Sequence, residues 1–215
     1  MDVTIKDMRN VSMDEFTVLR IHGVNALEEL AFAYREMQEY ERAVQKEDEE
    51  AKSGDWFMTA GAGNVRRRSI GERVTGRLFS VIISYQSSME AIVMNAPVLA
   101  RQFNTAKVPQ LQAAADTGGF KNKWVRALGA VGEDKAEFDR YHDDFYKGMR
   151  IPVTHLGEPS ALQAIEDITF KRVYEGVRDG WYAHARLVRG CGASTDTPED
   201  SWRTICAQRL PHDLF

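Results

Sequence analysis

The sequence predicts an all-α protein, an up-and-down helical bundle of four to five core helices. Apolar residues recur every three to four positions over long stretches, and no stretch of useful length alternates as a strand does. Three segments open with a serine followed three residues later by Glu or Gln, which is typical of a helix N-terminus. These segments are Ser12–Glu15, Ser69–Glu72 and Ser160–Gln163. We predict one bundle domain over residues 1–192 and a C-terminal tail over residues 193–215.

Composition limits the classes of protein to consider. The 215 residues are 43% hydrophobic and 28% charged, which is ordinary for a globular chain. A net charge of -4 argues against a protein that coats nucleic acid through its overall field, so any such contact needs a local basic patch. Two cysteines indicate a reducing compartment, and we see neither a secretion signal nor an apolar run of membrane-spanning length. We therefore expect a cytoplasmic protein without a membrane partner.

The first half of the chain predicts two long helices. An apolar stripe predicts a helix from about residue 13 to residue 50, and Ser53-Gly54 ends it. We predict a loop over residues 53–65, because Gly61 and Gly63 lack the strand and third glycine of a dinucleotide fingerprint. The second helix begins near Ser69, and Pro97 either kinks it or ends it.

Three consecutive arginines precede the second predicted helix. They oppose the positive end of its dipole, so helix stability does not explain them. A solvated patch is the common explanation of such a cluster, and a phosphate-binding patch is the functional one. We name Arg66, Arg67 and Arg68 as candidate substrate-binding residues.

The second half of the chain has a marked break. After a less regular stretch over residues 104–131, a helical pattern runs from Glu133 into the segment 148–157, where Pro152 and Gly148 disfavour a continuing helix. We predict a corner there, followed by a last long helix over residues 160–189. Apolar residues of the tail are candidates to dock on the bundle: Trp202, Ile205 and Leu210.

The predicted corner carries Arg150 and His155. The spacing alone is weak, because Arg178 and His184 give a similar pair by chance. Those two lie inside a continuous predicted helix, where six steps of about 100° place them on well-separated faces. A broken backbone can instead turn Arg150 and His155 into one groove, where a guanidinium and an imidazole together handle a phosphodiester.

The segment Tyr146–His155, with the long helix after it, resembles the HEPN family of helical-bundle proteins, which carry an Arg-x4-6-His motif near the junction of the last two core helices. Proline at 152 matches the family pattern. Ile151 stands where members usually have a polar residue, and Gly157 stands where some toxin members have a tyrosine.

This resemblance implies RNA as the substrate and a metal-independent endoribonuclease of the toxin or defence type. It implies that His155 acts as general acid or base and that Arg150 holds the phosphate oxygens. It further implies a homodimer with two facing motifs, a possible cognate antitoxin, and no cofactor. We add His142, Lys147 and Thr154, which flank the pair, as candidate substrate contacts.

Two other sets of residues suggest metal ligands. Asp139 and His142 share a predicted helix face, but no partner Glu-x-x-His occurs on another helix. The set of His184, Cys191, Cys206 and His212 has none of the close ligand pairs of a zinc site. We therefore expect no metal. The alternative to a nuclease is a non-catalytic helical-bundle interaction protein that forms a homodimer.

Overall fold

The computed structural model describes residues 15–53, 56–155, 157 and 159–211, and within these ranges it contains helices and no strand. The prediction of an all-α bundle is confirmed. The elements, in chain order, are α2 (Glu15–Ser53), α3 (Trp56–Phe103), η1 (Thr105–Lys107), α4 (Val108–Ala115), α5 (Phe120–Val131), α6 (Ala136–Arg140), η2 (Tyr141–Arg150), α7 (Ile151–Thr154), α8 (Pro159–Glu166), α9 (Phe170–Gly190) and α10 (Pro198–Arg209). No helix in the described ranges is long and apolar enough to cross a bilayer.

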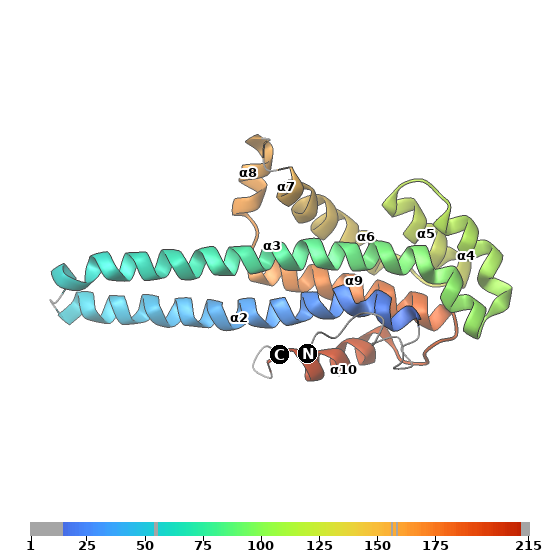
Figure 1. Ribbon diagram of the computed structural model, residues 1–215, viewed down its shortest axis with the longest axis horizontal. Coiled ribbons are helices and arrows are strands. Elements are labelled where there is room, and N and C mark those ends of the chain that lie inside the picture. The colour runs from blue at the N-terminus through green and yellow to red at the C-terminus, as the bar shows by residue number, and fades with distance from the viewer. Residues whose placement is uncertain (1–14, 54–55, 156, 158, 212–215) are drawn as a thin grey trace, which may run out of the picture.

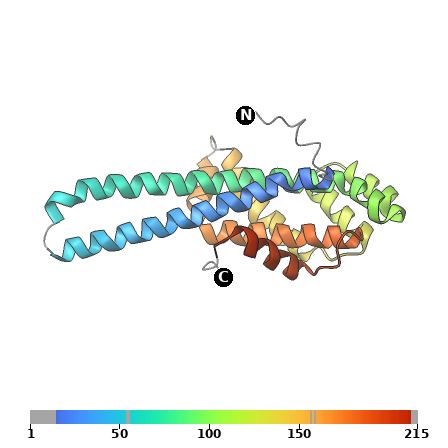
Figure 2. The same ribbon diagram turned by 60° about the horizontal axis from the view of Figure 1, so that its bottom comes forward.

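Helices α2 and α3 form a long antiparallel hairpin. One half of it projects beyond the other helices, and we call this half, residues 35–53 and 56–73, the arm (Figure 1). Figure 2 shows the same projection from another side. Ion pairs between the two helices support the arm and its base: Arg73 Nε lies 3.3 Å from Glu36 Oε1, and Arg77 Nη1 lies 2.8 Å from Glu29 Oε2.

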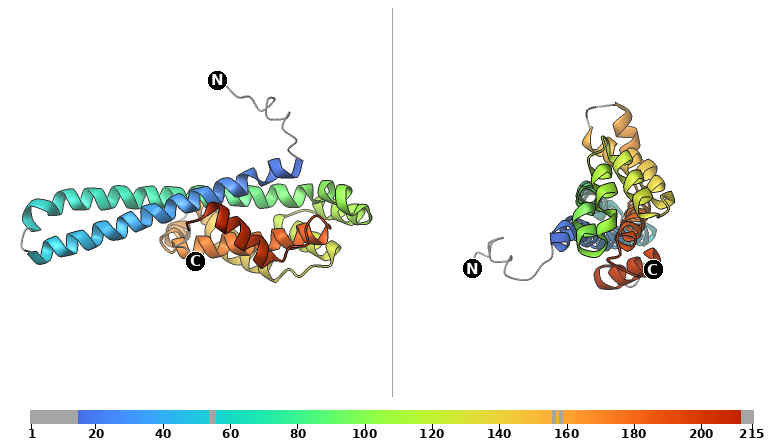
Figure 3. Two further views of the ribbon diagram at one scale, coloured as in Figure 1. Left: turned by 90° about the horizontal axis from the view of Figure 1, so that it is seen from below. Right: turned by 90° about the vertical axis from the view of Figure 1, so that its right-hand side faces the viewer.

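The other half of the hairpin is covered by the remaining helices. Helix α9 lies beside it, α10 lies on α9, and α4 and α5 close the end (Figures 1 and 3). Two glycines of α9 allow close packing there. A Cβ at Gly176 would lie 2.3 Å from Phe145 Cδ2, and a Cβ at Gly180 would lie 2.6 Å from Tyr85 Cε1. These contacts join η2, α3 and α9 into one core.

The prediction of a loop over residues 53–65 is wrong for the described residues, because α3 already begins at Trp56. Each helical glycine costs about 1 kcal/mol relative to alanine. The hairpin partner outweighs this cost, as the 2.8 Å pair between Arg67 Nε and Glu47 Oε2 illustrates. Helix α3 also continues past Pro97 to Phe103, so of the two expected outcomes the helix does not end there.

The predicted single helix over residues 160–189 is divided in two. Helix α8 ends at Glu166, and α9 begins at Phe170. Thr169 is extended, with φ -112° and ψ 156°, and its side chain accepts a hydrogen bond from Arg172 N at 3.3 Å. The Thr169 side chain supplies the acceptor that the Arg172 amide lacks in the first turn of the helix. Helix α9 therefore begins as a separate helix with its own N-cap.

The segment after residue 192 contains helix α10. Its N-cap is Thr197, whose Oγ1 accepts from Asp200 N at 3.1 Å, and Pro198 follows at the first helical position. The three apolar residues named in the sequence as docking candidates are buried in the core: Trp202, Ile205 and Leu210.

Candidate functional site

Arg150 lies at the end of an unusual helix. Residues 141–150 form a π-helix, and the amide of Ile151 still donates to the Tyr146 carbonyl five residues back. The α-helical pattern has returned at His155, whose amide donates to the Ile151 carbonyl at 3.1 Å. Pro152 lies between the π-helical and the α-helical hydrogen-bonding patterns. Because its nitrogen carries no hydrogen, no backbone hydrogen bond is lost at the change from one pattern to the other. The chain stays helical past Pro152, so the prediction of a break at the proline is wrong. The helix ends near the end of the predicted segment, at Thr154, and α8 begins at Pro159.

A column of planar groups supports Arg150. Its guanidinium carbon lies 5.5 Å from the centre of the Tyr146 ring. The Tyr146 ring stacks on His142 at 5.4 Å between ring centres, and His142 lies 6.1 Å from Phe138. On its flank, Tyr146 stacks on Phe120 at 5.0 Å. His142 is buried, so it holds the column in place and is not free to touch a substrate.

His155 is exposed where α7 ends. Thr154, also exposed, turns its hydroxyl inward to the carbonyls of Arg150 and Ile151, both at 3.0 Å. Among the described residues, no contact joins the side chains of Arg150 and His155. A site that uses both groups must therefore bring them together through the substrate or through a second copy of the chain.

The charges along η2 are partly paired. Lys147 Nζ lies 3.1 Å from Asp143 Oδ1, and the same carboxylate oxygen lies 3.0 Å from His142 Nδ1. The hydrogen bond to His142, followed by that from Lys147, lowers the pKa of Asp143 to about 2. Arg150, in contrast, has no carboxylate partner in the described part of the chain. Of the two cations of η2, Lys147 and Arg150, Arg150 is therefore the one whose charge is available to an external anion.

A hollow of about 440 Å³ is lined by residues of α6, η2 and α9. Asp179 at its floor pairs with Arg140, with Nε 3.1 Å from Oδ2. Arg172 also lines it and lies close to Gly148, since a Cβ at Gly148 would be in ordinary contact, 3.5 Å from the Arg172 Nη2. Arg172 donates to the Asp167 carbonyl at 2.8 Å and makes no ion pair among the described residues. Arg172 is a second available cation that the sequence analysis did not name.

The three arginines of the arm lie against acids. Arg66 Nη2 is 3.3 Å from Glu39 Oε1, and Arg68 Nε is 3.0 Å from Glu72 Oε1. Arg67 pairs with a glutamate of α2, as described above. A patch so neutralised attracts phosphate less than its sequence suggests. The structure does not bring these arginines into contact with Arg150 or His155.

The metal candidates also separate. Asp139 pairs with Lys135 at 2.8 Å, while His142 belongs to the aromatic column. No group of three potential metal ligands occurs in the ranges that the structure describes. Cys191 and Cys206 are buried free thiols, and His212 lies outside the described residues.

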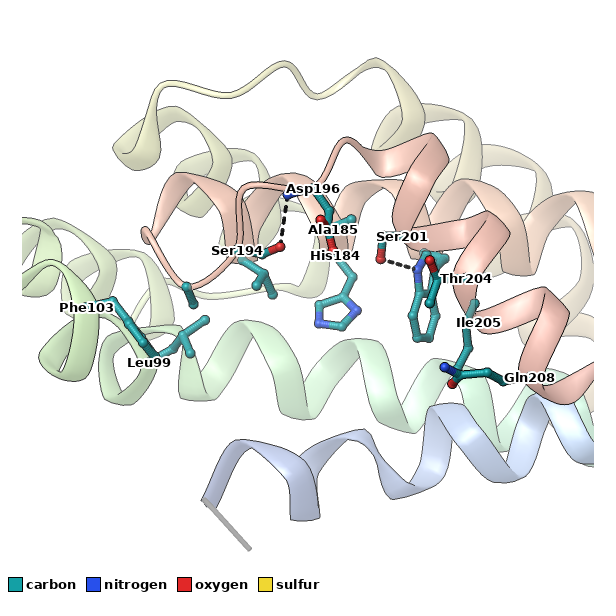
Figure 4. A pocket seen from close by; sticks show the side chains of 13 residues that line it. Leu99, Phe103, His184, Ala185, Ser194, Asp196, Ser201, Thr204, Ile205 and Gln208 are labelled. Atoms are coloured by element: carbon teal, nitrogen blue, oxygen red, sulfur yellow. Dashed lines mark hydrogen bonds between the residues drawn. The ribbon is translucent and has the colours of Figure 1, made fainter.

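A further hollow was missed by the sequence analysis. It has a volume of about 430 Å³ and is lined by residues from the end of α3, from α9, from the loop after α9 and from α10. The buried His184 lies in it (Figure 4). No local motif marks this hollow, because it forms only where α10 packs against α9, and the sequence predicts a tail there without a defined position. The aromatic column, in contrast, leaves a signal: Phe138, His142, Tyr146 and Arg150 recur every fourth residue.

Comparison of the chain with models of protein families, with curated proteins and with solved structures gave no match.

Proposed function

We propose that this chain is an RNA-binding, HEPN-like protein that cleaves RNA as a metal-independent endoribonuclease with Arg150 and His155. The observation that supports the proposal is the environment of the Arg150 guanidinium. Its guanidinium rests on the Tyr146 ring and has no carboxylate partner among the described residues. Guanidinium and aromatic planes are the surfaces on which single-stranded RNA bases stack, and guanidinium groups also bind phosphate bidentately.

The chemistry needs no metal because RNA carries its own nucleophile. His155 takes the proton of the 2′-hydroxyl, and the oxygen attacks the adjacent phosphorus. Arg150 stabilises the charge that develops on the non-bridging oxygens. The bond to the 5′-oxygen breaks, and that oxygen takes a proton from a second imidazole. The products are a 2′,3′-cyclic phosphate and a 5′-hydroxyl.

The second imidazole is the reason to propose a homodimer. One protomer supplies one Arg150 and one exposed His155, and these do not touch each other. A two-fold axis beside α7 would place the His155 of each protomer near the motif of the other. In a toxin or defence role, a cognate antitoxin would cover the same surface.

The test is cleavage of single-stranded RNA in EDTA. We expect 2′,3′-cyclic ends, and we expect His155→Ala to lower the rate by a factor of about 100 to 10,000 while remaining folded. Arg150→Ala should also lose activity. Arg126→Ala is the matched control, because Arg126 is exposed on α5 and makes no ion pair among the described residues. Equal cleavage by wild type and His155→Ala would refute the proposal.

The arm favours a second candidate, a non-catalytic interaction protein that forms a homodimer. The arm projects from the bundle (Figure 2), and Arg66 and Arg67 pair with its own glutamates, so their charges are partly cancelled. If no RNA is cleaved or bound while light scattering gives a dimer mass, this candidate is preferred. Deleting the arm should then reduce the mass to that of a monomer.

A further inference from the structure

The hollow that contains His184 has the character of a small-molecule site. It lies on the side of α9 that faces α10, and neither Arg150 nor His155 lines it. Its volume of about 430 Å³ falls within the range of about 300–1,000 Å³ that is common for ligand pockets. Whatever binds here is separate from the proposed RNA site.

Aromatic side chains form part of the lining of this hollow. Trp181 donates from its indole nitrogen to Ser201 Oγ at 3.0 Å, which ties α9 to α10. The Trp181 ring meets His184 edge to face at 5.4 Å between ring centres. Phe103, which is 53% exposed, forms the wall at the end of α3. These rings offer faces and edges against which a planar ring could pack.

Polar side chains make up much of the remaining lining. Figure 4 shows the imidazole of His184 directed into the hollow, with Ser194 on one side and Ser201 and Thr204 on the other. The residues that line the hollow include one carboxylate, Asp196, and neither lysine nor arginine. Asp196 makes no ion pair among the described residues, and its backbone amide donates to Ser194 Oγ at 3.1 Å.

The carboxylate of Asp196, in a lining without lysine or arginine, determines which class of ligand fits. A phosphate or carboxylate would find no cation to neutralise it here and would face the carboxylate of Asp196. A cation would pair with that carboxylate, while its ring replaced water against Trp181 and Phe103. We propose that this hollow binds a small planar aromatic ligand that carries an amine or amidine cation, with the cation at Asp196 and the ring between the aromatic walls.

The experiment uses benzamidine and benzoate, which have nearly the same shape and opposite charge. Each is titrated into the full-length protein while the indole N–H signal of Trp181 is followed by NMR. We expect benzamidine to shift this signal saturably with a Kd of about 1 mM, which is reasonable for so small a molecule. Benzoate should cause no saturable shift.

Two pairs of variants locate the site. Asp196→Asn should weaken benzamidine binding about tenfold, because a charged hydrogen bond is lost. Glu199→Gln removes the same charge from the first turn of α10 outside the hollow and should have no effect. Thr204→Trp should fill the hollow and abolish binding, whereas Ala207→Trp, on an exposed position of the same helix, should preserve it.

Three results would overturn the proposal. They are equal binding of benzamidine and benzoate, unchanged benzamidine binding in a folded Thr204→Trp variant, and the absence of any saturable shift up to about 10 mM, beyond which a fragment this small is not specific. None of them bears on RNA cleavage by Arg150 and His155, so the two proposals fail independently.

Discussion

The guanidinium of Arg150 lies over the ring of Tyr146, 5.5 Å from its centre and one helical turn further along the chain. Tyr146 is held in turn by His142 and Phe120. Arg150 is therefore positioned by an aromatic face and not by a carboxylate in the described part of the chain. This arrangement orients the cation without cancelling its charge, which is what a phosphate-binding arginine requires.

Removing the ring should weaken RNA binding without removing the arginine. A cation–π contact at a partly exposed site contributes about 0.5–1 kcal/mol, so we expect Tyr146→Ala to lower affinity for single-stranded RNA about two- to fivefold. Tyr146→Phe should bind like wild type. Fluorescence anisotropy with a labelled oligonucleotide measures this, and Tyr40→Ala, on the exposed face of α2, is the control. Equal losses in the Ala and Phe variants would show that the ring face is not what matters.

Mixing wild type with an inactive variant tests whether the active site is shared across a dimer. If each site needs the His155 of both protomers, a dimer of wild type with His155→Ala contains no complete site. Random pairing of equal amounts should then leave about a quarter of the cleavage rate of the same total amount of wild type, because only the wild-type homodimers remain active. If each protomer acts without its partner, about half of the rate should remain. The rate should be measured after mixing under conditions that allow subunit exchange.

The two close-packed glycines of α9 give a prediction on stability. Gly180→Ala places a methyl group 2.6 Å from Tyr85 Cε1 and 2.9 Å from Tyr141 Cδ2, two rings of the core. Such overpacking costs about 1–3 kcal/mol, which lowers the Tm by roughly 2–10 °C in a chain of this size. Gly76→Ala is the matched control, because nothing lies within 4 Å of its Cβ, and it should raise stability by about 0.5–1 kcal/mol. Equal Tm values for both variants would contradict the packing.

Much of the architecture follows from local patterns, because amphipathic periodicity reports directly which face of a helix is buried. The predictions of secondary structure fail where contacts or hydrogen bonds beyond the local pattern determine the backbone. Gly61 and Gly63 indicate a loop by themselves, but the long neighbour α2 makes a helix the better solution. Pro152 indicates a corner, yet the π-helix before it shifts the hydrogen bonds by one residue and accommodates the ring.

The candidate site likewise has features that the sequence predicts and features that depend on the tertiary structure. Arg150 and His155 could be picked out by type and spacing; His155 is exposed and Arg150 is partly buried. The neutralisation of Arg66 by Glu39 joins residues 27 apart, and no sequence rule pairs them. The hollow around His184 depends on where α10 docks, which follows from the tertiary position of Trp202 and not from its neighbours in sequence.

The two cysteines should be unreactive in the folded protein. Burial raises the pKa of Cys191 to about 11 and that of Cys206 to about 12, so both remain protonated at neutral pH. Because the thiolate is the reactive form, an Ellman titration should give almost no product until denaturant is added and two thiols per chain afterwards. Rapid reaction of the native protein would show that the end of α9 or α10 opens readily.

The partly buried pair of Glu137 and Arg186 should make the fold sensitive to acid. Arg186 Nη2 lies 2.8 Å from Glu137 Oε1, and the two side chains are 19% and 12% exposed, respectively. Burial by itself raises the pKa of Glu137, but the hydrogen bond and charge of Arg186 outweigh it, and the net pKa is lowered. A lowered folded pKa means that the stabilisation is complete above the unfolded pKa and is lost as the pH falls through the folded value.

Glu137→Gln should therefore cost about 1–3 kcal/mol at neutral pH and lose less stability than wild type between about pH 6 and about pH 3. Urea unfolding at each pH measures this, with Glu72→Gln as the control because its pair with Arg68 is exposed and contributes little. A parallel decline of wild type and Glu137→Gln with acid would mean that this carboxylate does not carry the pH dependence.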